Sequence, residues 1–162
     1  MKNKRIILGI DPGLADTGYG LVSNSGSEFI CLDYGVIKTK AGDSDSVRLK
    51  ILYQDLLLII NKYKPNLVAV EQLFFNTNAK TAIAVGQARG VVLLAIEEKK
   101  LPLVQLTPPQ VKLAVTAYGQ APKKQVQLMV QKILNLAKLP CPDDAADALA
   151  VAIGASSLPY VK

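Results

Sequence analysis

The chain has 162 residues, of which 50% are hydrophobic and 20% are charged, and its formal net charge is +6. This composition excludes an intrinsically disordered chain and is typical of one folded domain, which we expect over residues 1–162. With no histidine and only two cysteines, the protein lacks Ser-His and Cys-His nucleophile pairs, His-ligated zinc and four-thiolate zinc sites. Any bound metal would therefore be a hard cation with oxygen ligands, such as Mg²⁺ or Mn²⁺.

The apolar run near the N-terminus is shorter than that of a targeting signal or a membrane segment. The N-terminal segment is basic, but the apolar run in MKNKRIILGID covers only five residues before Asp11, which is too short for a signal-peptide core or a membrane span. Cys31 and Cys141 imply no disulfide framework. We therefore expect a cytoplasmic protein that has no membrane segment.

The first forty residues have the pattern of an antiparallel meander, because runs of apolar and β-branched residues are separated by turn residues. The expected strands cover residues 5–11, 19–23 and 29–39. Apolar residues then recur at helical spacing, which predicts a helix over 44–64. Capping candidates are Ser44, Asp45 and Ser46, and Pro65 follows the end of this helix.

Strands and helices alternate in the rest of the chain before helices alone follow. Two further strands are expected over 67–72 and 101–107. Helices are expected over 79–100, 108–119, 121–138 and 143–158. This order predicts an α/β fold with a mixed sheet that is flanked by helices.

Four acidic side chains are placed where a metal site could form. Asp11 and Glu71 each end an apolar strand, and sites in α/β sheets gather at the carboxyl ends of strands. Asp144 and Asp147 are three residues apart, so they share one face of the last helix. If the two acid-bearing strands are parallel neighbours, the carboxylates converge, and shared divalent ions would offset their repulsion.

Some of these acids also have simpler explanations. Asp143 is explained by an N-cap of the last helix, and Asp144 could interact with the helix dipole. Asp11 could belong to an ordinary Asp-Pro-Gly turn. Glu71 and Asp147 are harder to explain in this way, because burying a carboxylate without a partner is costly.

A lysine-rich segment without acidic residues covers 99–142. Its lysines are Lys99, Lys100, Lys112, Lys123, Lys124, Lys132 and Lys138. A surface of one charge sign indicates binding of a polyanion such as DNA, although a solvated basic face explains the composition equally well.

Several motifs occur in the order found in a known family: GIDPG…TGYG, EQLFF…N, GQARGV, QVK, KQVQ and DDAADALAVAI. Over residues 6–153 the chain resembles the RuvC family of bacterial Holliday-junction resolvases. The resemblance implies a homodimeric endonuclease with a ribonuclease-H-like fold and a five-stranded sheet, which cuts four-way DNA junctions symmetrically in recombination and repair. It also implies two Mg²⁺ ions per subunit, with Mn²⁺ able to substitute, and the branch-migration proteins RuvA and RuvB as partners.

The same resemblance assigns roles to individual residues. The implied catalytic and metal-binding residues are Asp11, Glu71, Asp144 and Asp147. Phe74 matches an aromatic residue that stacks on bases near the strand-exchange point, and Lys112 and Lys123 match basic residues near the scissile phosphate. Lys124, which adjoins Lys123 in the lysine-rich segment, is a further candidate DNA contact.

Gly86 and Gly90 are four residues apart in the helix expected over 79–100. Glycine weakens a helix, so its presence predicts close approach of another backbone, either the sheet of this chain or a second subunit.

Three other functions compete with junction resolution. A ribonuclease-H-like nuclease acting on RNA or an RNA–DNA hybrid would share the acid-bearing strands. An actin- or hexokinase-like ATPase would need two lobes, and 162 residues barely supply one. A DNA-binding module without catalysis would leave Glu71 and Asp147 without a purpose.

Overall fold

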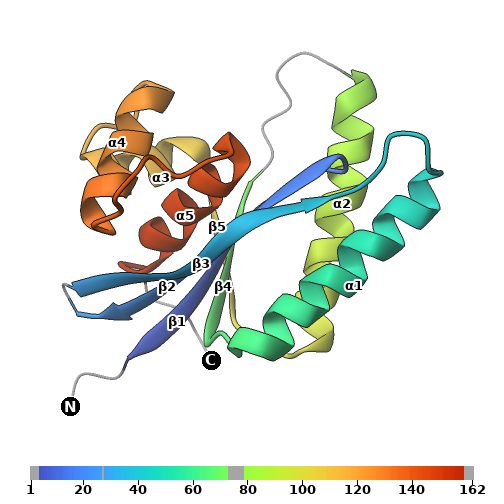
Figure 1. Cartoon of the computed structure of the whole chain (residues 1–162), viewed down its shortest axis with the longest axis horizontal. Coiled ribbons are helices and arrows are strands. Elements are labelled where there is room, and N and C mark those ends of the chain that lie inside the picture. The colour runs from blue at the N-terminus through green and yellow to red at the C-terminus, as the bar shows by residue number, and fades with distance from the viewer. Residues whose placement is uncertain (1–3, 27, 73–78, 159–162) are drawn as a thin grey trace.

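A five-stranded sheet forms the centre of the computed structural model, which describes residues 4–26, 28–72 and 79–158. Helices cover both faces of the sheet (Figure 1). The strands are β1 (Arg5–Asp11), β2 (Asp16–Ser25), β3 (Glu28–Lys38), β4 (Leu67–Glu71) and β5 (Leu103–Leu106). The helices are α1 (Asp45–Tyr63), α2 (Ala79–Glu98), α3 (Pro108–Thr116), α4 (Lys123–Ile133) and α5 (Asp143–Ala155).

The strand order across the sheet is β3-β2-β1-β4-β5. The first three strands form the expected antiparallel meander, and β1, β4 and β5 run parallel to one another. The prediction of a mixed five-stranded sheet flanked by helices is therefore confirmed. Within the described ranges, no helix has the length and apolarity needed to cross a membrane.

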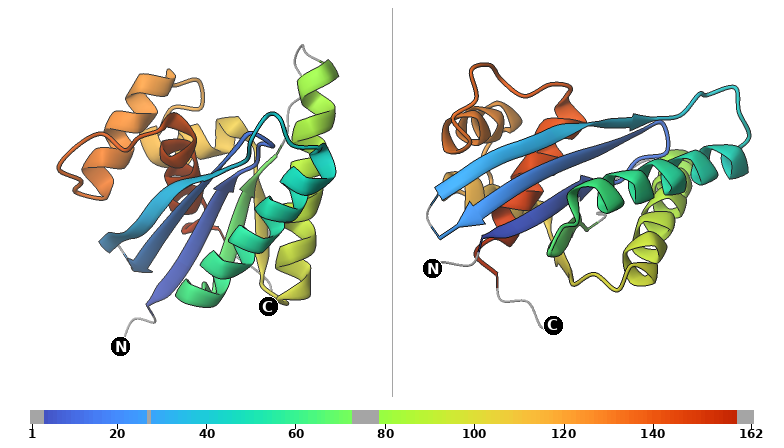
Figure 2. Two further views of the ribbon diagram at one scale, coloured as in Figure 1. Left: turned by 45° about the vertical axis from the view of Figure 1, so that its right-hand side comes forward. Right: turned by 60° about the horizontal axis from the view of Figure 1, so that its bottom comes forward.

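The central strands β1 and β4 are apolar on both sides because helices cover both faces of the sheet (Figure 2). Successive side chains of a strand point to opposite faces. On one face, Ile7 and Leu67 pack with residues of α3, α4 and α5. On the other face, Leu8 and Val68 pack with residues of α1 and α2. The continuous apolar runs in the sequence reflect this double burial.

Helix α5 lies directly on the backbone of β1 and β2. A Cβ built on Gly9 would fall 2.0 Å from the carbonyl oxygen of Ala148, and one built on Gly20 would fall 2.7 Å from the backbone nitrogen of Leu149. These two glycines are paired across the β1–β2 ladder. Glycines on the strands, together with the alanines of α5, therefore bring the helix closer to the sheet than larger side chains would permit.

Several predicted helices end earlier than the sequence suggested, and left-handed residues mark the ends of two of them. The helix expected over 108–119 ends at Thr116, because Ala117 adopts a left-handed conformation with φ 59°. The helix expected over 121–138 ends at Ile133, and Asn135 takes φ 49° shortly after it. The apolar residues continue at helical spacing past both ends, so the sequence pattern did not predict where these helices stop.

Candidate functional site

Asp11 and Glu71 lie at adjacent strand ends on one edge of the sheet. Ile10 of β1 is paired with Val70 of β4 in parallel register, so the next residue in each strand carries a carboxylate. Burial raises the pKa of Asp11 to about 8, and the charges of Glu71, Asp147 and Asp144 add to this effect. Burial, together with the charge of Asp147, raises the pKa of Glu71 to about 7. The strand ends therefore bring two acids together as the sequence predicted.

Helix α5 supplies Asp144 and Asp147 from its first two turns. Both side chains are partly buried. Burial raises the pKa of Asp147, and the opposing ion pair with Lys123 does not fully offset it. The charges of Glu71, Asp144 and Asp147 all raise the pKa of Asp11, so the other three predicted acids lie within electrostatic reach of Asp11.

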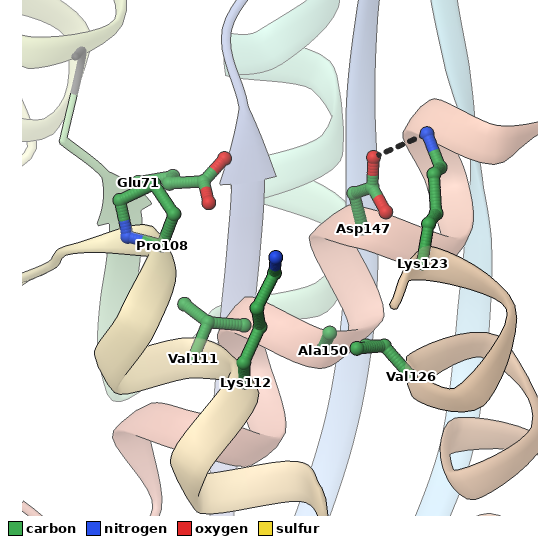
Figure 3. A pocket seen from close by; sticks show the side chains of 8 residues that line it. All are labelled: Glu71, Pro108, Val111, Lys112, Lys123, Val126, Asp147 and Ala150. Carbon is green, nitrogen blue, oxygen red and sulfur yellow. Dashed lines mark hydrogen bonds and ion pairs between the residues drawn. The ribbon is translucent and has the colours of Figure 1, made fainter. Parts of the chain in front are cut away.

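A pocket of about 200 Å³ separates Glu71 from Asp147. Figure 3 shows Glu71 on one side of this pocket, Asp147 and Lys123 on the other, and Lys112 between them. The lining residues are Glu71, Pro108, Val111, Lys112, Lys123, Val126, Asp147 and Ala150. The pocket is smaller than typical cofactor pockets, which enclose roughly 300–1,000 Å³.

Local capping positions the wall of the pocket that carries Lys112. Thr107 is the N-cap of α3, and its hydroxyl accepts a hydrogen bond from the backbone nitrogen of Gln110 at 3.3 Å. The side chain of Gln110 accepts one in return from the backbone nitrogen of Thr107 at 2.8 Å. This reciprocal pair fixes the start of α3 directly after β5.

The prediction that Asp143 caps α5 is wrong. Pro142 occupies the N-cap position, and Asp143 is the first residue of the helix. Its carboxylate accepts a hydrogen bond from Gln127 Nε2 at 2.9 Å and lies 3.3 Å from Lys123 Nζ. The residue therefore interacts with α4 and leaves the backbone of its own helix uncapped by a side chain.

The donor set fits a hard divalent cation. It consists of carboxylates alone, and neither Asp11 nor Glu71 forms an ion pair with a described residue. Partly buried acids with raised pKa values and no cationic partner at contact distance would be stabilised in their ionised form by a bound cation. Within the described ranges, no group of three or more potential ligands is arranged to hold an ion as it stands. Side-chain rotation would therefore accompany metal binding.

The candidate DNA contacts differ in their position relative to the pocket. Lys112 and Lys123 line the pocket, whereas Lys124 is exposed on α4 outside it. Phe74 lies outside the described residues. A Cβ built on Gly86 or Gly90 would have nothing within 4 Å, so the close approach predicted for these glycines is not made within the described part of this chain.

Sequence reasoning missed residues that position the site. The hydroxyl of buried Thr17 donates a hydrogen bond to the carbonyl oxygen of Gly13 at 2.5 Å, which fixes the turn after Asp11. The strand glycines Gly18 and Gly20 place α5 on the sheet. Their spacing of two residues, which puts them on one face of β2, was the available signal.

The chain matches known proteins over almost its whole length. The family model described as "Crossover junction endodeoxyribonuclease RuvC" matches residues 7–155. The chain is 54% identical to the protein of that name from Halothermothrix orenii, over 91% of this chain and 90% of the relative. It is 53% identical to the one from Alkaliphilus oremlandii, over 91% and 90%. The solved structure of T. thermophilus RuvC with a Holliday junction substrate superposes with a TM-score of 0.90 at 36% identity, covering 94% of this chain and 93% of that chain.

Proposed function

This chain belongs to the RuvC family of crossover junction endodeoxyribonucleases, and we propose that the four carboxylates at one edge of its sheet are the residues with which it cuts Holliday junctions. The observation that carries the proposal is the burial of Asp11 and Glu71 beside each other and beside the acids of α5. A fold gains nothing from such crowding unless a cation compensates it. Family membership favours DNA junctions over RNA or RNA–DNA hybrids as the substrate.

The proposed cofactor is Mg²⁺, two ions per subunit, for which Mn²⁺ can substitute. Asp11, Glu71, Asp144 and Asp147 would hold the ions through carboxylate oxygens. When bound, such ions lower the pKa of an attacking water and stabilise charge on the leaving 3′ oxygen. The contribution of the chain is to hold these acids close together on two strands and one helix, where bound cations would favour their ionised form.

The lysines would act on the DNA backbone. Lys112 and Lys123 line the same pocket as Glu71 and Asp147, which supports a role for their ammonium groups in neutralising charge on the phosphate that is cut. Lys124 lies on the exposed surface of α4 and would contact phosphates farther from the cut. Phe74 is proposed to stack on a base near the strand-exchange point.

A homodimer is proposed to supply two equivalent sites for two symmetric cuts. Helix α2 offers an interface, because Ile83, Gly86, Gly90 and Leu94 recur at helical spacing along one face. Ile83 and Leu94 are 67% and 60% exposed, and the glycines leave space for another backbone. From family membership we also propose that the branch-migration proteins RuvA and RuvB are partners of this protein and that its location is cytoplasmic.

The proposal is tested by cleavage of a synthetic four-way junction, with linear duplex and RNA–DNA hybrid as comparison substrates. Wild type is assayed with Mg²⁺ and with a chelator, beside Asp147→Asn. We expect junction cleavage only by wild type with Mg²⁺. Cleavage by the variant, or by wild type in the chelator, would contradict the proposed site.

A further inference from the structure

Lys123 brings a positive charge to the acids of α5 from a different helix. Its Nζ lies 3.1 Å from Asp147 Oδ2 and 3.3 Å from Asp143 Oδ2. The first contact is also a hydrogen bond, which Figure 3 shows at the edge of the pocket. Lys123 is the first residue of α4, and its side chain is 53% exposed, compared with 31% for Asp147.

We propose that Lys123 is an internal counter-ion that takes the place of a cation beside Asp147 in the metal-free protein and is displaced when a metal ion binds. The inference rests on the proposed metal site. The ammonium is hydrogen-bonded to Asp147 Oδ2, so it occupies a position beside that oxygen that a metal ion would take. Among the described residues, no group of three or more potential ligands is arranged to hold an ion while this contact is made.

The geometry also gives the ammonium a position to occupy after displacement. Asp143 is more exposed than Asp147, at 67% against 31%, and it holds the same Nζ from outside the pocket. A long side chain that starts at the first residue of a helix can turn from one carboxylate toward the other without moving the backbone. Such a partly exposed ion pair is weak enough to exchange. Asp143 is thereby assigned a role, namely to hold Lys123 when Asp147 turns to the metal and no DNA phosphate is bound.

The Lys123 ammonium and a metal ion are both positively charged and would repel each other beside Asp147, so Lys123 must weaken metal binding. Removing Lys123 should therefore tighten it. Removing any positive charge from the pocket would by itself tighten metal binding to some extent. Lys112→Met measures this general effect, because Lys112 lines the same pocket but forms no ion pair with a described acid.

The test measures Mn²⁺ binding without DNA, by the electron paramagnetic resonance signal of the free ion. Wild type, Lys123→Met and Lys112→Met are compared. We expect Lys123→Met to bind Mn²⁺ about three- to fivefold more tightly than Lys112→Met, as the loss of a partly exposed ion pair predicts. Equal affinities in the two variants would overturn the counter-ion role while leaving the metal site intact. Absence of Mn²⁺ binding by wild type would overturn both.

A second measurement needs no substitution. Lysine acylation of the wild-type protein, quantified by mass spectrometry, reports how readily each ammonium is released from its partners. Mg²⁺ should raise the reactivity of Lys123 relative to exposed Lys124, which serves as the internal reference. An unchanged ratio would show that Lys123 keeps its partners in the metal-bound protein and would overturn the proposal.

Discussion

Gly18 lies directly against the first turn of α5: a Cβ built on it would fall 2.0 Å from the carbonyl oxygen of Asp144. Gly18 is also the partner of Asp11 across the β1–β2 ladder. One glycine thus contacts the helix that carries Asp144 and pairs with the strand residue Asp11. The distance between these two carboxylates depends on the absence of a side chain at position 18.

Replacing Gly18 with alanine should therefore separate the acids. The added methyl group meets backbone atoms that cannot rotate away, so we expect α5 to shift and the free energy of unfolding to fall by about 1–3 kcal/mol. Junction cleavage should fall by about 10²-fold, as expected for catalytic groups displaced by about 1 Å. Chemical denaturation and single-turnover cleavage measure the two effects. Gly42→Ala is the control, because its Cβ would have nothing within 4 Å; equal behaviour of the variants would refute the argument.

The glycine contacts also show which features of the site could not be predicted from the sequence. The strand ends at Asp11 and Glu71 could be predicted, because apolar runs and the turn that follows are local features. The contact between Gly18 and Asp144 joins residues 126 positions apart, and no local pattern encodes such a pairing. The glycines of α2 invited the same explanation, yet none of the described residues approaches them. A glycine indicates that space is needed but does not identify what fills it.

Asp143 and Asp147 illustrate the same limit within one helix. The spacing of the acids predicted which side chains share a face, but it could not predict that Lys123 of α4 would hold both of them. Asp143 therefore looked like a cap, since the partner that explains it belongs to another helix. Tertiary contacts of this kind override local preference.

Asp147→Asn should separate binding from catalysis. The amide keeps the shape of the side chain but loses the charge that would hold a cation, so we expect cleavage to fall at least about 10³-fold. Junction affinity in the absence of divalent ions should be retained, because one negative charge is removed near the DNA. Glu97→Gln, an exposed position on α2, controls for charge loss elsewhere. A variant that fails to fold, judged by circular dichroism, would make Asp147 structural.

The metal-free protein should lose stability as the pH rises. The pKa of Asp11 is raised from 3.8 to about 8 and that of Glu71 from 4.5 to about 7, so between pH 4 and 8 the folded state binds more protons than the unfolded state. Their contribution to stability is full below about pH 4 and is lost by about pH 8. Urea denaturation in a chelator across this range measures the decline.

Asp11→Asn should make that decline shallower, because the variant has no proton to lose at this position. Mg²⁺ should also reduce the decline in wild type, since it binds the ionised carboxylates and releases their protons. If wild type and Asp11→Asn show the same pH dependence, the carboxyl of Asp11 does not titrate over this pH range in the folded protein.

Lys124→Met should alter the salt dependence of junction binding. Each lysine that neutralises a phosphate contributes about one unit to the slope of log affinity against log salt concentration. We expect the magnitude of the slope to fall by about 1 in this variant, measured by fluorescence anisotropy over a range of salt concentrations. Lys138→Met, an exposed lysine beyond the end of α4, should leave the slope unchanged. Identical slopes for both variants would remove Lys124 from the DNA interface.

The exposed face of α2 should determine whether the protein is a dimer. Ile83→Glu places a charge in the proposed interface, where burial without a partner is costly, so we expect it to sediment as a monomer at concentrations where wild type is a dimer. Leu58→Glu is the matched control, because Leu58 is 65% exposed on α1 and Ile83 is 67% exposed on α2. The monomer should also nick junctions without coordinating the second cut. A dimeric Ile83→Glu protein, or a monomeric Leu58→Glu protein, would place the interface elsewhere.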